Sequence, residues 1–166
     1  MVLGIDPGTH RTGYAAVEQS AGRLVVHEFG VITTPASAAT AARLQTIYDR
    51  VRGLIERYRP TVAGVERLFL GQNAPSAVSV GQARGVVLLA LEQGGVDIEE
   101  YTPSAVKTTI VGYGRADKAQ VQEMVRLLYH LDAPPRPDDA ADALALAFCA
   151  LGDAAARRSA QGGGRR

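Results

Sequence analysis

Short apolar segments that end near a polar residue alternate with longer amphipathic segments along this chain. Residues 2–6 (VLGID) and 61–66 (TVAGVE) are apolar until they close on an acidic residue, which is typical of buried strands that end at a sheet edge. Residues 12–19 and 24–32 have strand character on either side of a short polar turn, and they predict an antiparallel hairpin. Residues 96–101 (VDIEEY) predict a fifth strand.

Apolar residues at intervals of three and four predict the helices. One such pattern runs from Leu44 to Tyr58 and stops at Pro60. Thr102 followed by Pro103 is a helix cap with proline at the first helical position. The last helix is expected to begin near Asp138. Two further helices are predicted by the apolar faces that contain Ala77, Val80, Val87, Leu88 and Leu91, and Val121, Val125 and Leu128.

The predicted order of elements, β-β-β-α-β-α-β-α-α-α, defines an α/β fold with a mixed five-stranded sheet and helices on both faces. The first strand pairs with both the hairpin and the later crossover strand, so we expect it to be central. Residues 1–153 are predicted to form one domain, because 166 residues suit a single core. Residues 154–166 are predicted to be a disordered, basic tail rich in glycine and arginine.

The net charge of +1 conceals an uneven distribution of charge. The tail contains Arg157, Arg158, Arg165 and Arg166, and without these four arginines residues 1–156 carry −3. The tail arginines suit either contact with phosphate or a solvated terminus, and the sequence does not separate these interpretations. The single cysteine, Cys149, cannot form an internal disulfide, which favours a cytoplasmic location. No segment is long and apolar enough to span a bilayer, and we expect no membrane association.

Four carboxylates stand at positions that suit a shared site. Asp6 and Glu66 end the two apolar strands, and Asp139 and Asp142 are three residues apart on the last helix, so that they share one face. Like charges that converge in a buried place raise each other's pKa unless a cation compensates. Hard cations such as magnesium prefer carboxylate oxygens, and two ions about 3.5–4 Å apart form a common site for phosphodiester hydrolysis.

Each acid also has a structural alternative. The Asp-Pro-Gly sequence that begins at Asp6 is a turn signal, Glu66 suits a strand end, and Asp138 or Asp139 suits a helix cap. Asp142 is the hardest to explain structurally, because apolar residues surround it on its helix. The joint arrangement of the four acids therefore favours a functional interpretation.

Five stretches of the chain together resemble the RuvC family of Holliday junction resolvases. They extend from Val2 to about Ala150 in the family's order and spacing, and they read GIDPGTHRTGYA, VERLFLGQNAPSA, GQARGV, YTPSAVKTTIVGYGRADKAQVQEMV and PDDAADALALA. The resemblance implies an RNase H-like fold and a homodimer that cuts four-way DNA junctions symmetrically during recombination and repair. It also implies two magnesium ions per site, which manganese can replace, and work with a branch-migration helicase complex.

The resemblance also assigns roles to individual residues. The catalytic and metal-binding carboxylates it implies are Asp6, Glu66, Asp139 and Asp142, with Asp138 left open as an alternative to Asp139. Lys107 and Lys118 match basic positions linked to catalysis and DNA contact. Phe69 matches an aromatic residue that stacks on an unpaired base, and Arg67 and Arg84 are candidate phosphate contacts.

A four-way junction has near two-fold symmetry, which a symmetric dimer matches. We predict that the helix over residues 76–92 forms the dimer interface, because Ala77, Gly81 and Gly85 permit close approach. Three alternatives stay open: a sugar-kinase or actin-like ATPase, suggested by GIDPGT alone; an RNase H-like nuclease that trims RNA precursors; and an inactive junction-binding protein. The first needs a second domain, the second lacks the GQARG and paired-lysine context, and the third does not need four acids.

Overall fold

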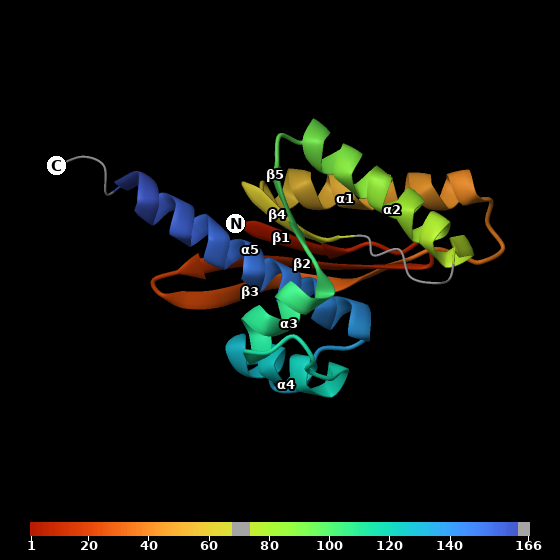
Figure 1. Ribbon diagram of the computed structural model, residues 1–166. Coiled ribbons are helices and arrows are strands. Elements are labelled where there is room, and N and C mark those ends of the chain that lie inside the picture. Colours follow the sequence, from red (N-terminus) through yellow and green to blue (C-terminus); the bar gives the residue numbers. More distant parts are fainter. Residues whose placement is uncertain (68–73, 163–166) are drawn as a thin grey trace.

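The computed structural model describes residues 1–67 and 74–162, and it contains the ten predicted elements in the predicted order (Figure 1). They are β1 (Val2–Asp6), β2 (Arg11–Ser20), β3 (Arg23–Thr33), α1 (Thr40–Tyr58), β4 (Val62–Glu66), α2 (Ala74–Gln93), β5 (Asp97–Tyr101), α3 (Pro103–Val111), α4 (Lys118–Leu128) and α5 (Asp138–Gly162).

The five strands form one sheet in the order β3-β2-β1-β4-β5, so β1 is central as predicted. β2 runs antiparallel to both β1 and β3, whereas β4 runs parallel to β1 and β5. Ile5 lies opposite Val65 in the register of β1 and β4. The residues that follow, Asp6 and Glu66, therefore lie next to each other at the same edge of the sheet.

Helices cover both faces of the sheet, as predicted, and each face has its own apolar core (Figure 1). Because side chains alternate along a strand, Leu3 and Ile5 of β1 face α1 and α2. Val2 faces the opposite side, where it packs with Leu144 and other residues of α3, α4 and α5. The two layers hold β1 between them.

Three glycines let α5 lie directly on the backbone of the sheet. A Cβ atom on Gly4 would overlap the carbonyl oxygen of Ala143, and one on Gly13 would overlap the carbonyl oxygen of Asp139. A Cβ on Gly64 would stand 2.5 Å from the carbonyl oxygen of Leu146. The side of α5 that contacts the sheet also carries small residues, which are fully buried: Ala140, Ala143, Ala147 and Ala150. This close contact determines the distance between α5 and the sheet.

α5 continues through residues 154–162, where the sequence predicts a disordered tail. Two side-chain contacts hold this end of α5 against β5: Arg157 pairs with Glu99, and the Tyr101 hydroxyl donates to Asp153 at 2.6 Å. The first part of the tail is therefore helical. Within the described residues, no helix has both the length and the apolar character needed to cross a bilayer.

Gly4→Ala is expected to lower the free energy of unfolding by about 2–3 kcal/mol, because an added methyl group forces α5 away from β1. Gly53→Ala in α1 is the matched control, since nothing lies within 4 Å of a Cβ added there. Alanine is also the better helix former, so the control should be more stable than wild type by about 0.5–1 kcal/mol. Urea unfolding measures both changes, and wild-type stability of Gly4→Ala would contradict the packing argument.

Candidate active site

Two carboxylates reach the site from neighbouring strand ends. Asp6 ends β1 and Glu66 ends β4, and the parallel register of these strands brings the two residues to one edge of the sheet. The carboxyl groups approach closely enough for a hydrogen bond from Asp6 to lower the pKa of Glu66, against the larger effect of burial, which raises it. The carboxyl edge of a parallel pair is where α/β folds commonly place ligands.

The N-terminal part of α5 brings further carboxylates to the same edge. α5 begins at Asp138, and its backbone at Asp139 rests on Gly13, the residue opposite Asp6 in β2. Asp142 lies about one turn further along the helix. The contact between α5 and the glycines thus determines where these aspartates lie relative to the strand ends.

The carboxylates act on one another electrostatically. Burial raises the pKa of Asp6 to about 8, with further upward contributions from Glu66, Asp142 and Asp139. Burial and the charge of Asp142 raise the pKa of Glu66. Burial also raises the pKa of Asp142, although the Lys118 ammonium opposes the shift. Without a bound cation, the folded protein therefore disfavours the charged form of these carboxyl groups. Near neutral pH Asp6 retains a proton.

Two cationic side chains partly neutralise the α5 aspartates. The Lys118 ammonium, at the start of α4, lies 3.1 Å from an Asp138 oxygen and 3.8 Å from an Asp142 oxygen. The Arg11 guanidinium, at the start of β2, lies 2.9 Å from an Asp139 oxygen. About half of the side-chain surface of each cation is exposed, so both are accessible to a ligand as well.

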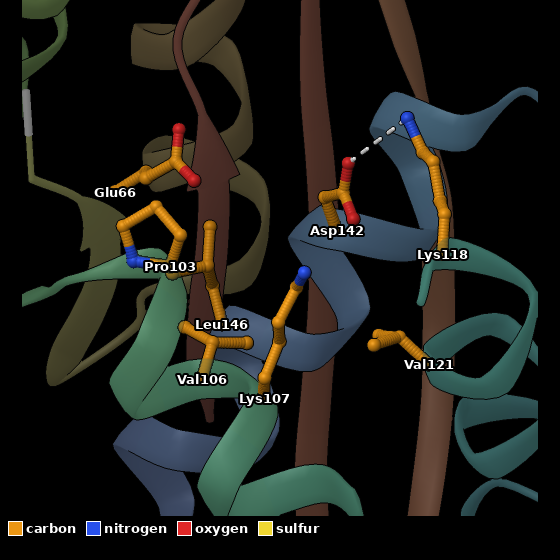
Figure 2. A pocket seen from close by; sticks show the side chains of 8 residues that line it. All are labelled: Glu66, Pro103, Val106, Lys107, Lys118, Val121, Asp142 and Leu146. Atoms are coloured by element: carbon orange, nitrogen blue, oxygen red, sulfur yellow. Dashed lines mark ion pairs between the residues drawn. The ribbon is translucent and has the colours of Figure 1, made fainter. Parts of the chain in front are cut away.

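A cavity of about 200 Å³ opens beside these groups. Figure 2 shows Glu66, Lys107 and Asp142 directed into it, with the ion pair between Lys118 and Asp142 at one side. Its apolar wall is formed by Pro103, Val106, Val121 and Leu146. The site therefore combines carboxylates, two lysines and a partly apolar wall in one depression.

The donor set suits magnesium in its chemistry, since hard divalent cations prefer carboxylate oxygens and the excess negative charge calls for a cation. Among residues 1–67 and 74–162, no three His, Cys, Asp or Glu side chains form a ready-made metal cage. Two of the α5 aspartates are drawn instead to Arg11 and Lys118. Magnesium keeps several waters and needs only one or two protein carboxylates, so the absence of a cage is compatible with this ion.

The structure distinguishes Asp139 from Asp138. The charge of Asp139 contributes to the raised pKa of Asp6, and the charges of both Asp139 and Asp138 raise the pKa of Asp142. Hydrogen bonds from Lys118 and Gln122 hold the pKa of Asp138 below its ordinary value. This arrangement supports Asp139 as the third carboxylate and gives Asp138 a role in holding Lys118.

The other predicted residues lie in different surroundings. Lys107 and Lys118 line the cavity as expected of site residues. Arg67 is exposed beside Glu66. Arg84 is paired with Glu100 and with the backbone of Glu66, which does not favour the predicted phosphate contact. Phe69 lies outside the described residues.

Sequence reasoning missed Arg11 and the three glycines that seat α5. A signal for two of the glycines is present, because VLGID and VAGVE each contain a glycine two residues before the terminal acid. A glycine inside a strand often marks a close approach of another backbone. Arg11 gives no comparable signal, since its partner Asp139 is 128 residues away in the chain.

The fold and the site together define an RNase H-like nuclease. The solved structure described as T. thermophilus RuvC in complex with Holliday junction substrate superimposes with a TM-score of 0.83 at 36% identity. The match covers 89% of this chain and 90% of that one. The RNase H-like fold predicted from the sequence is thereby confirmed.

The family follows from the sequence comparisons. A family model described as "Crossover junction endodeoxyribonuclease RuvC" matches residues 2–150. The protein of that name from Roseiflexus sp. (strain RS-1) is 54% identical over 147 residues, or 89% of this chain and 88% of that protein. Its counterpart from Heliobacterium modesticaldum is 51% identical over 149 residues, or 90% and 92% of the two chains. The chain belongs to the RuvC family of crossover junction endodeoxyribonucleases.

Asp6→Asn is expected to stabilise the metal-free protein, and to do so more at pH 8 than at pH 5. Folding raises the pKa of Asp6 from 3.8 to about 8, so between these values the folded state holds a proton that the unfolded state has lost. Stability therefore falls as the pH rises through this window, and the neutral amide removes the effect. The extra gain at pH 8 should exceed about 1 kcal/mol, or roughly 2–4 °C in Tm at this chain length.

Thermal unfolding in a chelator at the two pH values measures this difference. Asp132→Asn is the matched control, because it removes the same charge from an exposed position. A Tm gain for Asp6→Asn that is equal at pH 5 and pH 8 would contradict the electrostatic description of the site.

Proposed function

We propose that this protein is a magnesium-dependent endonuclease that resolves four-way DNA junctions in recombination and repair by paired, symmetric cuts. The observation that carries the proposal is the convergence of carboxylates from two strand ends and α5. Burial raises the pKa of Asp6 there to about 8, and the charges of Glu66, Asp142 and Asp139 add to the shift. Membership of the RuvC family supplies the reaction class. The solved relative in complex with a Holliday junction supports the choice of substrate.

Asp6, Glu66, Asp139 and Asp142 would hold the metal in this proposal. Magnesium bound there supplies Lewis-acid chemistry for hydrolysis of a phosphodiester. The carboxylates would hold the ion where the scissile phosphate binds. Asp6 gives up its retained proton as positive charge arrives, so binding of divalent metal is expected to tighten as the pH rises toward 8.

Lys118 and Arg11 are proposed to exchange partners when the substrate binds. Each neutralises an aspartate of α5, and each is about half exposed. With these aspartates holding a divalent cation, the ammonium and the guanidinium would be free to contact phosphate oxygens. Lys107, on the opposite side of the cavity, adds a third positive charge for the DNA backbone. Arg67 and Phe69 remain candidates for contacts with phosphate and with an unpaired base.

A homodimer is proposed to form through α2. Val78 and Leu89 are 63% and 51% exposed, and they are eleven residues apart, which is about three turns of helix. They therefore point the same way, and Gly85, seven residues after Val78, is exposed between them. Leu89 also lines a shallow hollow with Leu44, Tyr48 and Val86. A contiguous apolar face of this kind suits a second copy, which two symmetric cuts require.

The remaining expectations concern the setting of the reaction. The free, buried Cys149 agrees with the predicted cytoplasmic location. Cooperation with a branch-migration helicase complex, expected from the family resemblance, is part of the proposal.

Incubation with a synthetic four-way junction, with and without magnesium, tests the function directly. Paired nicks at mirrored positions that require the metal are the expected result. Single nicks, or equal cutting of linear duplex, would contradict selective resolution of junctions. Manganese in place of magnesium should also support cutting.

Asp142→Asn is expected to reduce cleavage at least about 100-fold, because an amide is a poorer ligand than a carboxylate for the ion and its charge. Binding of the junction without metal should change less than about threefold, since removal of a negative charge does not weaken attraction to phosphate. Gel-shift and single-turnover assays measure both effects. Asp132→Asn is the control, because it removes the same charge from an exposed position away from the cavity, and it should cleave at the wild-type rate. Cleavage by Asp142→Asn near the wild-type rate would exclude the role given to Asp142.

Leu89→Glu is expected to shift the protein from dimer to monomer, because the substitution places a charge in the centre of the proposed apolar face. Leu127→Glu in α4 is the matched control, since Leu127 is a helix leucine of similar exposure, 48%. Sedimentation velocity over a range of concentrations separates the two forms. A wild-type monomer at all concentrations, or a dimer that tolerates Leu89→Glu, would argue against this interface.

A further inference from the structure

Arg84 lies behind the candidate site and contacts the strand that carries Glu66. Its side chain comes from α2 and is only 19% exposed. The Nε atom donates to the backbone carbonyl oxygen of Glu66 at 3.3 Å. The same guanidinium pairs with Glu100 of β5. Arg84 therefore joins the ends of two neighbouring strands.

The Glu66 carbonyl needs this donor because the ladder between β1 and β4 stops one step early. The Arg67 amide donates to the Tyr101 carbonyl at 2.8 Å, so residue 67 faces β5 and the carbonyl of Glu66 faces β1. In a parallel ladder with Ile5 opposite Val65, the next donor to that carbonyl is the amide of residue 7. Residue 7 is proline and has no amide hydrogen. Pro7 thus removes the hydrogen bond that would hold the end of β4 against β1.

We propose that Arg84 is a positioning residue that supplies this missing hydrogen bond and so sets the direction of the Glu66 carboxylate. The inference rests on the proposed function, in which Glu66 binds the metal. Pairing with β5 extends to Glu66, but pairing with β1 ends at Val65. On the β1 side the Glu66 carbonyl is therefore held by Arg84. The ion pair with Glu100 holds the guanidinium itself in place.

A second contact links α2 to the other strand end. The hydroxyl groups of Thr9 and Ser79 lie 2.5 Å apart, and Thr9 is in the turn that follows Asp6. α2 is therefore attached near both carboxylates that come from the sheet. This arrangement explains why an arginine stands on a helix whose other buried residues, such as Ala83 and Val87, are apolar.

Arg84→Met tests the proposal, because methionine keeps an unbranched side chain but has no donor. Binding of Mn²⁺ to the DNA-free protein, measured by calorimetry, is expected to weaken about tenfold, as is typical when a group that orients a metal ligand is lost. The magnesium concentration for half-maximal cleavage should rise by about the same factor. Junction affinity in a chelator should stay within about twofold of wild type. Arg52→Met is the matched control, since Arg52 pairs with Glu56 on α1, and it should match wild type in every assay.

A compensating substitution sharpens the test. Pro7→Ala restores an amide at residue 7, so in the Arg84→Met background it should recover part of the lost metal affinity. If Arg84→Met does not fold, Glu100→Gln provides the comparison, because it keeps the donor but releases the guanidinium from its ion pair. That variant should also bind Mn²⁺ more weakly than wild type.

The outcomes separate this inference from the proposed function. Unchanged Mn²⁺ affinity of the tested variant would overturn the inference, as would failure of Pro7→Ala to recover any affinity. Lower junction affinity with a smaller salt slope and normal metal affinity would also overturn it, because that pattern marks a phosphate contact. Wild-type protein that binds Mn²⁺ but cuts no junction would instead overturn the proposed function, while the metal-binding comparison would still decide the role of Arg84.

Discussion

The direct contact between α5 and the backbone of the sheet is the constraint on which the candidate site depends. Gly4, Gly13 and Gly64 leave no side chains under the helix, so the carbonyl groups of α5 rest against the strands. Larger side chains at these three positions would hold the helix further from the sheet. The glycines bring α5 closer, and Asp139 and Asp142 come within electrostatic range of Asp6. Packing and chemistry are therefore set by the same contact.

The fold accepts a local electrostatic cost at this contact. Burial and mutual repulsion raise the pKa values of Asp6, Glu66 and Asp142, which means that their charged forms are disfavoured in the folded protein. Lys118 and Arg11 offset part of the repulsion. Burial of apolar side chains in two cores, one on each face of the sheet, stabilises the fold and offsets this electrostatic cost. In the proposed function, a divalent cation and a phosphodiester would complement the charges that remain.

α2 connects the candidate site with the proposed dimer face. Its inner side reaches the two strand ends through Ser79 and Arg84, and its outer side exposes Val78 and Leu89. The hydrophobic residues of α2 are spread around the helix. This distribution is expected if one side packs on the sheet and another forms the proposed dimer contact. The proposed dimer and the proposed placement of Glu66 thus involve the same helix.

The sequence by itself determined the order of the elements, the central place of β1 and the helices on both faces, and it singled out the candidate carboxylates. These are local signals: alternation of apolar residues, a proline after Thr102, and acids at the ends of apolar strands. Tertiary structure alone decided the partner of Arg11, the different surroundings of Asp138 and Asp139, and the contacts of Arg84 with Glu66 and Glu100. Each of these depends on residues far apart in the chain, and neither composition nor spacing records which way a long side chain turns. The helical continuation of α5 through residue 162 belongs to the same group, because its contacts with Glu99 and Tyr101 lie on a strand more than fifty residues earlier.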